Sequence, residues 1–112
     1  GSGLDIIYPP ENKNLAEEIS KNGAVVSGFP NGTLPEGKNF LARNQLIVKF
    51  SQAVLVIEGK RRSGTISTAN HAGNEGIEVF AIAGSEATDY LIENGASIAN
   101  TPQDILEYLN QR

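Results

Sequence analysis

Four short apolar runs, rich in β-branched residues and separated by segments of helical periodicity, constrain the fold of this chain most strongly. The runs are "AVVSGF" (24–29), "AVLVIE" (53–58), "EVFAIA" (78–83) and "SIAN" (97–100). Their near-continuous hydrophobicity is typical of strands that are buried on both faces. Because strands and helices alternate at this spacing, the strands should pair in parallel through right-handed crossovers. The sequence therefore predicts an α/β fold, a three-layer sandwich with a mainly parallel sheet and helices on both faces.

The segments between the runs carry signals for helix starts and stops. Gly23, Gly76 and Gly95 each follow a periodic segment, as glycines at helix ends do. Near the end of the chain, Thr101 stands as an N-cap and Pro102 at the first helical position. These signals predict helices over 11–23, 38–50, 63–76, 86–95 and 101–109.

The composition bounds the class of protein. At 112 residues the chain is expected to form one domain with a single core. The sequence has no cysteine and one histidine, so we expect no disulfide, no metal site and no cofactor. No apolar run approaches the roughly 20 residues that a membrane span needs, so we expect a cytoplasmic protein without membrane contact. The opening "GSG" (1–3) is interpreted as an expression scar, which leaves 4–112 as the domain.

Charge is distributed unevenly along the chain. The net charge of −4 argues against an indiscriminate nucleic-acid binder. Six of the nine Lys and Arg residues nevertheless fall between positions 38 and 62, where Glu58 is the only acid. The sequence therefore predicts one positive face on an acidic body.

Three consecutive cations, Lys60, Arg61 and Arg62, follow the apolar run 53–58. In an open parallel sheet the carboxyl ends of the strands share one edge, and ligands bind there. The loops expected at this edge are "PNGTLPEGK" (30–38), "GKRRSG" (59–64) and "GSEA" (84–87).

The helix predicted after these cations starts without an acid. If Ser63 caps it, the backbone N–H groups of Gly64, Thr65 and Ile66 have no partner within the helix, and the first acid, Glu75, comes near its other end. A phosphate would satisfy both these donors and the helix dipole. The alternative is an ordinary serine cap behind a solvated charge run, and spacing alone does not separate the two. The pattern is neither a Walker loop nor "GxGxxG".

Arg43 and Asn44 lie in a predicted helix that is otherwise apolar, so one of them should fall near its buried face. Arg43 either forms a structural pair with Glu58 or reaches the ligand edge as a phosphate clamp. Phe40 is interpreted first as a staple or core residue and second as a base-stacking platform. No catalytic residue is expected, because His71 has no triad partners and Glu58 is a single carboxylate.

Three segments carry motifs that cover essentially the whole chain: "GLDIIYPPENKNLAEEI" (3–19), "GAVVSGFPNGTLPEGKNFLARNQLI" (23–47) and "VLVIEGKRRSGTISTANHAGNEGIEVFAIAGS" (54–85). They resemble, in the same order, "GLD-x-x-YP-x-EN-x-x-L", a segment ending in "FP-x-RNRII", and "VLVVEA-x-x-x-SGSLITA" followed by "VFAVPGS". These are motifs of the DNA-processing protein DprA family, also called Smf.

The resemblance implies a Rossmann-like fold, binding of single-stranded DNA, and help in loading the RecA recombinase during natural transformation. Single-stranded DNA and RecA are the partners implied, and a homodimer stays open. The family's phosphate-binding edge matches Arg43, Asn44, Ser63, Gly64 and Thr65, with Phe40 as a candidate base contact. Together with Lys60, Arg61 and Arg62, these are the predicted DNA-binding residues.

The sequence departs from the family pattern at several positions. The second arginine of "RNR" is Gln45, and Asp89 and Tyr90 replace "GxN". The family's earlier "GSR" and "SG-x-A-x-GID" segments are not in this sequence, so we expect the second half of its Rossmann-like domain. Two other classes stay open. One is a nucleotide-binding or phosphoribohydrolase-like enzyme, against which the missing "PGGxGT" motif weighs, and the other is a dimerisation scaffold that binds no DNA.

Overall fold

The computed structural model describes residues 1–111, which divide into two compact units. The first unit is Gly1–Leu46, and the second begins at Ile47. Helix α2 (Gly37–Lys49) runs from the first unit into the second. Among the described residues, no helix combines the length and the apolar character needed to cross a membrane.

The first unit consists of helices and hydrogen-bonded loops. It contains the short 3-10 helix η1 (Pro10–Asn12), helix α1 (Lys13–Asn22) and most of α2. The carboxylate oxygens of Asp5 accept the N–H of Gly32 at 2.9 and 3.0 Å. This contact ties the segment before η1 to the loop before α2.

Residues 1–3, which we interpret as an expression scar, are bonded within this unit. The hydroxyl of Ser27 donates to the carbonyl of Ser2 at 2.6 Å, and the N–H of Gly3 donates to the carbonyl of Thr33 at 3.1 Å. Gly3 is buried. The three residues therefore take part in the fold of the unit, and their origin stays a prediction.

The strand predicted at 24–29 is wrong. These residues form no strand, and Val26 is 62% exposed rather than buried. A strand needs a neighbouring backbone that pairs with its N–H and C=O groups, and the described first unit contains no other strand. A β-branched composition favours a strand but does not supply this partner.

The second unit holds the parallel sheet that the sequence predicts. Strands β1 (Ala53–Val56), β2 (Glu78–Ala81) and β3 (Ser97–Ile98) lie in the order β1-β2-β3, and both pairings are parallel. The other three predicted strands are thus confirmed in position and direction. They end at residues 56, 81 and 98 rather than at 58, 83 and 100.

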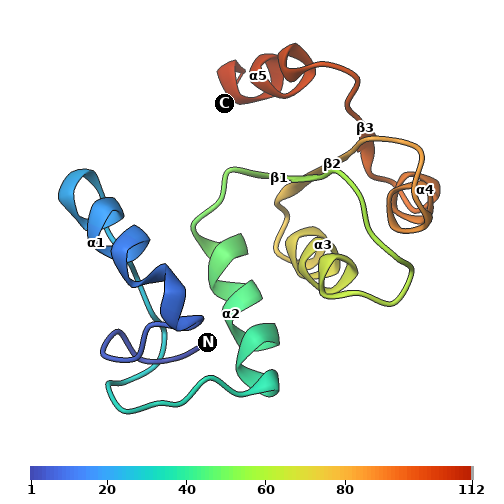
Figure 1. Cartoon of the computed structure of the whole chain (residues 1–112). Coiled ribbons are helices and arrows are strands. Elements are labelled where there is room, and N and C mark those ends of the chain that lie inside the picture. Colours follow the sequence, from blue (N-terminus) through green and yellow to red (C-terminus); the bar gives the residue numbers. More distant parts are fainter. Residues whose placement is uncertain (112) are drawn as a thin grey trace. The chain divides into compact units, whose positions relative to one another are not determined.

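Helices cover both faces of this sheet, as predicted. Helices α3 (Gly64–Asn74) and α4 (Glu86–Glu93) lie on one face, and α5 (Pro102–Asn110) lies on the other (Figure 1). On the α5 face, the ring of Phe80 packs edge-on against Tyr108, with centroids 5.6 Å apart. The second unit is therefore a three-layer α/β arrangement.

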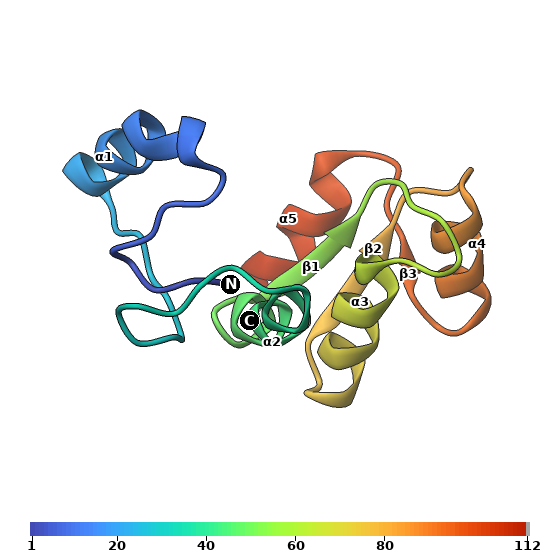
Figure 2. The same ribbon diagram turned by 60° about the horizontal axis from the view of Figure 1, so that its bottom comes forward.

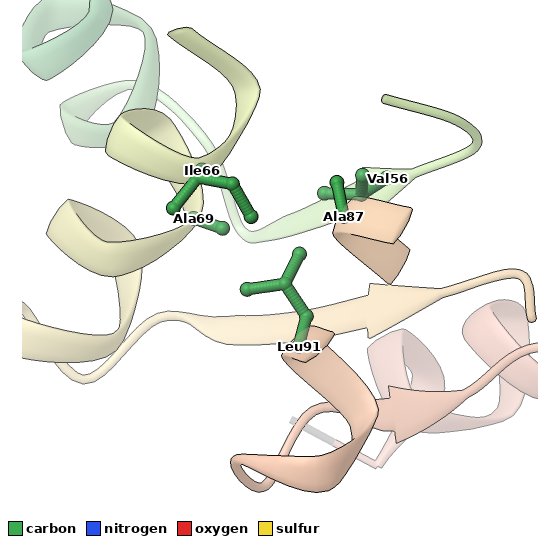
Figure 3. Close-up of a cluster of buried hydrophobic side chains, with 5 residues drawn as sticks. All are labelled: Val56, Ile66, Ala69, Ala87 and Leu91. Carbon is green, nitrogen blue, oxygen red and sulfur yellow. The ribbon is translucent and has the colours of Figure 1, made fainter. Parts of the chain in front are cut away.

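The core on the other face joins β1, α3 and α4. It is a cluster of five buried side chains: Val56, Ile66, Ala69, Ala87 and Leu91 (Figure 3). Two of the five are alanines, which leave little side-chain bulk between the helices and the sheet. This packing fixes the starts of α3 and α4 close to the carboxyl ends of β1 and β2.

The chain returns to the sheet through glycines where the sequence predicts helix ends. Gly76 follows α3 with φ +75° and Gly95 follows α4 with φ +108°. Both angles lie in the left-handed region, which glycine adopts without the steric cost that a Cβ brings.

Candidate nucleic-acid interface

The loop of residues 59–63, called here the cationic loop, links β1 to α3 and is anchored to the start of α4 (Figure 2). The N–H of Gly59 donates to Ser85 Oγ at 3.3 Å, and the carbonyl of Gly59 accepts the N–H of Ala87 at 3.0 Å. Because β1 and β2 are parallel neighbours, the loops after them meet at the carboxyl edge of the sheet. This confirms the predicted proximity of the loops 59–64 and 84–87. The third predicted loop, 30–38, belongs to the first unit.

The first turn of α3 has backbone donors without acceptors. Ser63 is the N-cap residue, as predicted, but its hydroxyl donates to the carbonyl of Lys60 at 2.9 Å and does not cap the helix. Of the three N–H groups expected to be free, that of Ile66 donates to the carbonyl of Ser63 at 3.2 Å, so this part of the prediction is wrong. Within residues 1–111, the N–H groups of Gly64 and Thr65 have no hydrogen-bond acceptor. The turn also contains no acid. This end of α3 therefore keeps its partial positive charge uncompensated.

Two cations of the loop are exposed and unpaired. Lys60 and Arg62 lie on the surface, and within the described chain neither forms an ion pair. In the sequence, Ser63 alone separates Arg62 from the free N–H groups of α3. The loop and the helix start thus combine positive charge with aligned hydrogen-bond donors, an arrangement that suits an anion.

Arg61 differs from its two neighbours because both its backbone and its side chain contact α4. Its N–H donates to Glu86 Oε1 at 3.0 Å. Its guanidinium carbon lies 3.5 Å from the centroid of the Tyr90 ring. Two contacts to α4 therefore restrain Arg61, whereas within residues 1–111 the side chains of Lys60 and Arg62 form no hydrogen bond, ion pair or ring contact.

The other three predicted residues form a cluster on α2 in the first unit. Nε of Arg43 donates to Asn44 Oδ1 at 3.2 Å, and the guanidinium carbon lies 5.9 Å from the Phe40 ring centroid. Phe40 is 37% exposed, and its ring centroid lies 6.5 Å from that of Tyr8.

The charge of Arg43 also acts on the amino group of Gly1. The pKa of this amino group is lowered, first by burial and second by the charge of Arg43.

Arg43 lies in the first unit and Glu58 in the second, and both side chains are exposed. The interpretation of the two residues as a structural pair therefore stays a prediction. Asn44 is the half-buried residue of the pair 43–44, which agrees with the expectation that one of them lies toward the packed face of α2. The role of Arg43 as a phosphate clamp stays a prediction.

Sequence reasoning missed the residues that hold the cationic loop in place, namely Ser85, Glu86 and Tyr90. A signal for Glu86 was available, because loops after neighbouring parallel strands meet and Glu86 opens the helix beside three cations. The stacking of Tyr90 carried no such signal. It depends on the rotation of α4, which brings position 90 beneath Arg61.

Comparisons with known proteins identify the family. The chain matches the family model described as DNA recombination-mediator protein A over residues 1–110. It is 39% identical to protein Smf of Synechocystis over 97% of this chain and 29% of that protein. It is 38% identical to DNA processing protein DprA of Streptococcus pneumoniae over 95% of this chain and 40% of that protein. The chain therefore spans less than half the length of these relatives.

Two solved structures are similar as well. The DprA structure from Streptococcus pneumoniae has a TM-score of 0.86 at 38% identity, over 95% of this chain and 40% of that one. The structure of DNA processing protein A from Helicobacter pylori, which concerns that protein's single-stranded DNA binding mode, has a TM-score of 0.88 at 30% identity, over 98% of this chain and 54% of that one. These likenesses confirm the predicted α/β, Rossmann-like partial domain. The chain belongs to the DNA recombination-mediator protein A family, the DprA family that its motifs resemble.

Proposed function

We propose that this chain binds single-stranded DNA and that it recognises the phosphate backbone at the carboxyl edge of the sheet. The observation that carries the proposal is the start of α3, where the free N–H groups of Gly64 and Thr65 follow the cationic loop. Helix-start donors beside cations suit an anion, and the repeated anion of a single strand is its phosphate. Membership of a family of DNA-processing proteins supports DNA as the ligand.

No side chain of the described residues competes for these donors. The hydroxyl of Ser63 donates a hydrogen bond to the carbonyl of Lys60, and the hydroxyl of Thr68 donates one to the carbonyl of Gly64. A phosphate oxygen would therefore gain hydrogen bonds without displacing a protein group. It would also be favoured by the dipole of α3.

The proposed binding is weak and tolerant of base sequence. Contacts to phosphate position a strand without reading its bases, and the cationic loop contains three cations, Lys60, Arg61 and Arg62. A few phosphate contacts, each contributing about 0.7 to the log-log salt slope on single strands, predict a slope of roughly −2 to −4.

The cluster on α2 is proposed as a second contact region. Phe40 presents a partly exposed ring that a base can stack on, and Arg43 presents an exposed guanidinium for a phosphate. By the family resemblance, Asn44 belongs to the same group. Nε of Arg43 donates a hydrogen bond to Asn44 Oδ1, which holds the side chains of Arg43 and Asn44 together.

Fluorescence anisotropy with labelled oligonucleotides tests the proposal. Two unrelated single strands and a duplex are titrated with the wild-type chain and with a Lys60→Ala/Arg62→Ala variant at several salt concentrations. The variant should bind both single strands more weakly by the same factor, and its salt slope should be smaller by about 1.4. A Lys13→Ala/Lys21→Ala variant removes the same charge from α1 and should keep the wild-type slope.

Three results would contradict this function. They are a preference for the duplex, affinity that does not change with salt, and equal effects of the two double variants. Tighter binding of a mononucleotide than of the oligonucleotides would instead favour the nucleotide-binding enzyme. No binding of either ligand would favour the scaffold.

We also propose, from the family resemblance, that the chain supports RecA loading during natural transformation and recombination, and that it forms a homodimer. The family description as a recombination mediator supports the first of these. Sedimentation of the chain alone and with RecA tests both partners. We expect the chain to sediment as a dimer by itself and as a heavier complex when RecA is present. A monomer that sediments independently of RecA at micromolar concentrations would contradict both proposals.

A further inference from the structure

We propose that Tyr90 positions Arg61 for phosphate binding, an inference that rests on the proposed DNA binding of the cationic loop. The guanidinium carbon of Arg61 lies 3.5 Å from the Tyr90 ring centroid, which is the distance of face-to-face stacking. Arg61 comes from the loop after β1 and Tyr90 from α4. The stack therefore fixes a loop side chain against a separate element of the fold.

Stacking leaves the hydrogen-bond donors of Arg61 free. A guanidinium is planar, and a ring against its face does not use the N–H groups that lie in its plane. Within residues 1–111, these N–H groups have no acceptor, and the side chain is exposed. They can therefore form a bidentate contact with a phosphate, a geometry that arginine matches well.

Tyr90 is a suitable support because it is itself held in place. Its ring is half-buried and packs against the core cluster of α3, α4 and β1. The helix that carries it begins with a reciprocal cap, in which Ser85 Oγ accepts the N–H of Thr88 at 3.2 Å and Thr88 Oγ1 accepts that of Ser85 at 3.0 Å. Helix and core thus fix the ring on which Arg61 rests.

The backbone of Arg61 is fixed by the same helix. Its N–H donates to Glu86 at 3.0 Å, and the preceding residues are anchored through Gly59. With both backbone and side chain restrained, Arg61 has less rotamer freedom to lose when it binds. That loss is one of the costs of association. Arg61 is therefore the pre-organised phosphate ligand of the loop, and Tyr90 is its positioning residue.

The test is a double-mutant cycle on single-stranded DNA affinity. Tyr90→Leu removes the ring but keeps an apolar side chain on the core. This variant should bind about two- to fivefold more weakly, because that is the contribution expected of an exposed cation–π contact. Tyr90→Phe keeps the ring and should bind like the wild type. Arg61→Ala should weaken binding at least as much and reduce the salt slope by about 0.7. The double variant Arg61→Ala/Tyr90→Leu should bind no more weakly than Arg61→Ala alone.

Arg61→Lys provides a second route that leaves Tyr90 and the core untouched. Lysine keeps the charge but lacks the planar fork, so this variant should also bind more weakly than the wild type. Circular dichroism melts establish that each variant is folded.

Different outcomes separate this inference from the function on which it rests. The inference is overturned if Tyr90→Leu or Arg61→Lys binds like the wild type while Arg61→Ala does not. It is also overturned if the losses of the two single variants add in the double variant, or if Tyr90→Phe is as weak as Tyr90→Leu. If Arg61→Ala and Lys60→Ala/Arg62→Ala both bind normally, the loop is not the DNA site and the proposed function fails first.

Discussion

The carbonyl oxygen of Gly59 accepts a hydrogen bond from the N–H of Ala87 over 3.0 Å, which joins the loop after β1 to the first turn of α4. The two residues approach so closely that a Cβ built on Gly59 would lie 3.2 Å from Cβ of Ala87. Every cation of the loop follows this anchor in the sequence. The position of the proposed phosphate site therefore depends on a contact that leaves little room for a side chain.

Gly59→Val should disrupt this anchor. The branched side chain would meet Ala87, Ser63 and Thr65, all within 3.6 Å of the built Cβ, and overpacking of this kind costs about 1–3 kcal/mol. We expect a lower free energy of unfolding in urea and weaker DNA binding. A variant as stable as the wild type would show that the loop can move away from α4 without cost.

Gly73→Ala is the matched glycine substitution and should have the opposite sign. Gly73 is the penultimate residue of α3, and a Cβ there would meet no atom within 4 Å. Alanine is favoured over glycine at helical positions by up to about 1 kcal/mol. The urea midpoint should therefore rise, and a fall would mean that position 73 has a contact that the structure lacks.

Leu91→Ala should destabilise the second unit strongly. Leu91 is 6% exposed within the core cluster shown in Figure 3, and truncation of a buried leucine costs about 2–5 kcal/mol. Leu106→Ala on α5 is the control, because Leu106 is 46% exposed. Equal shifts of the denaturation midpoint in the two variants would contradict the assignment of the core to the α3–α4 face.

Gly3→Val should destabilise the first unit. A Cβ on this buried glycine would lie 2.5 Å from the carbonyl oxygen of Pro30, a backbone atom that cannot turn aside. We expect faster amide hydrogen exchange at Thr33, whose N–H donates to that same carbonyl. Gly37→Ala, where a Cβ would meet nothing within 4 Å, should leave this exchange rate unchanged. Unchanged exchange in Gly3→Val would mean that residues 1–3 are dispensable for the unit.

Asp104 should make the second unit sensitive to acid. Its carboxylate accepts hydrogen bonds from the N–H groups of Asn100 at 2.8 Å and Thr101 at 3.1 Å. Both bonds lower the pKa of Asp104, and the bond from Asn100 has the larger effect. The folded pKa lies below the unfolded one, so the ionised carboxylate stabilises the fold above the unfolded pKa. That contribution is lost as the pH falls through the folded pKa.

Urea unfolding of the wild type and of Asp104→Asn, at neutral pH and in acid, checks this effect. The wild type should be more stable at neutral pH, and the difference should shrink as the carboxylate is protonated. A difference that stays constant with pH would show that the carboxylate charge has no part in it. An NMR titration of Asp104 should give a pKa below the ordinary aspartate value of about 3.9.

The second unit could largely be predicted from the sequence, because its signals are local. Apolar runs mark β1, β2 and β3, and the glycines at 76 and 95 mark the ends of α3 and α4. The strand expected at 24–29 failed because strand formation depends on a pairing partner, which no local pattern encodes. The composition of that segment resembles that of β1, and only the neighbourhood differs.

The candidate site was predictable in its charges but not in its contacts. The run Lys60 to Arg62 and the acid-free start of α3 are plain in the sequence. That Ser63 turns its hydroxyl to Lys60, and that Arg61 alone among the three cations stacks on a ring, depends on how the loop lies against α4. The sequence does not distinguish the three cations, because it shows the charge of each side chain and not its partner.

The backbone amide spectrum of the chain during titration with a short single strand tests whether DNA binds at the start of α3. We expect the amide resonances of Gly64 and Thr65 to shift in a saturable manner, because their N–H groups bind phosphate. In Lys60→Ala/Arg62→Ala, the same shifts should require more DNA. Resonances of Gly64 and Thr65 that stay in place while others shift, for example those of residues 94–96 after α4, would contradict the claim that DNA binds at the start of α3.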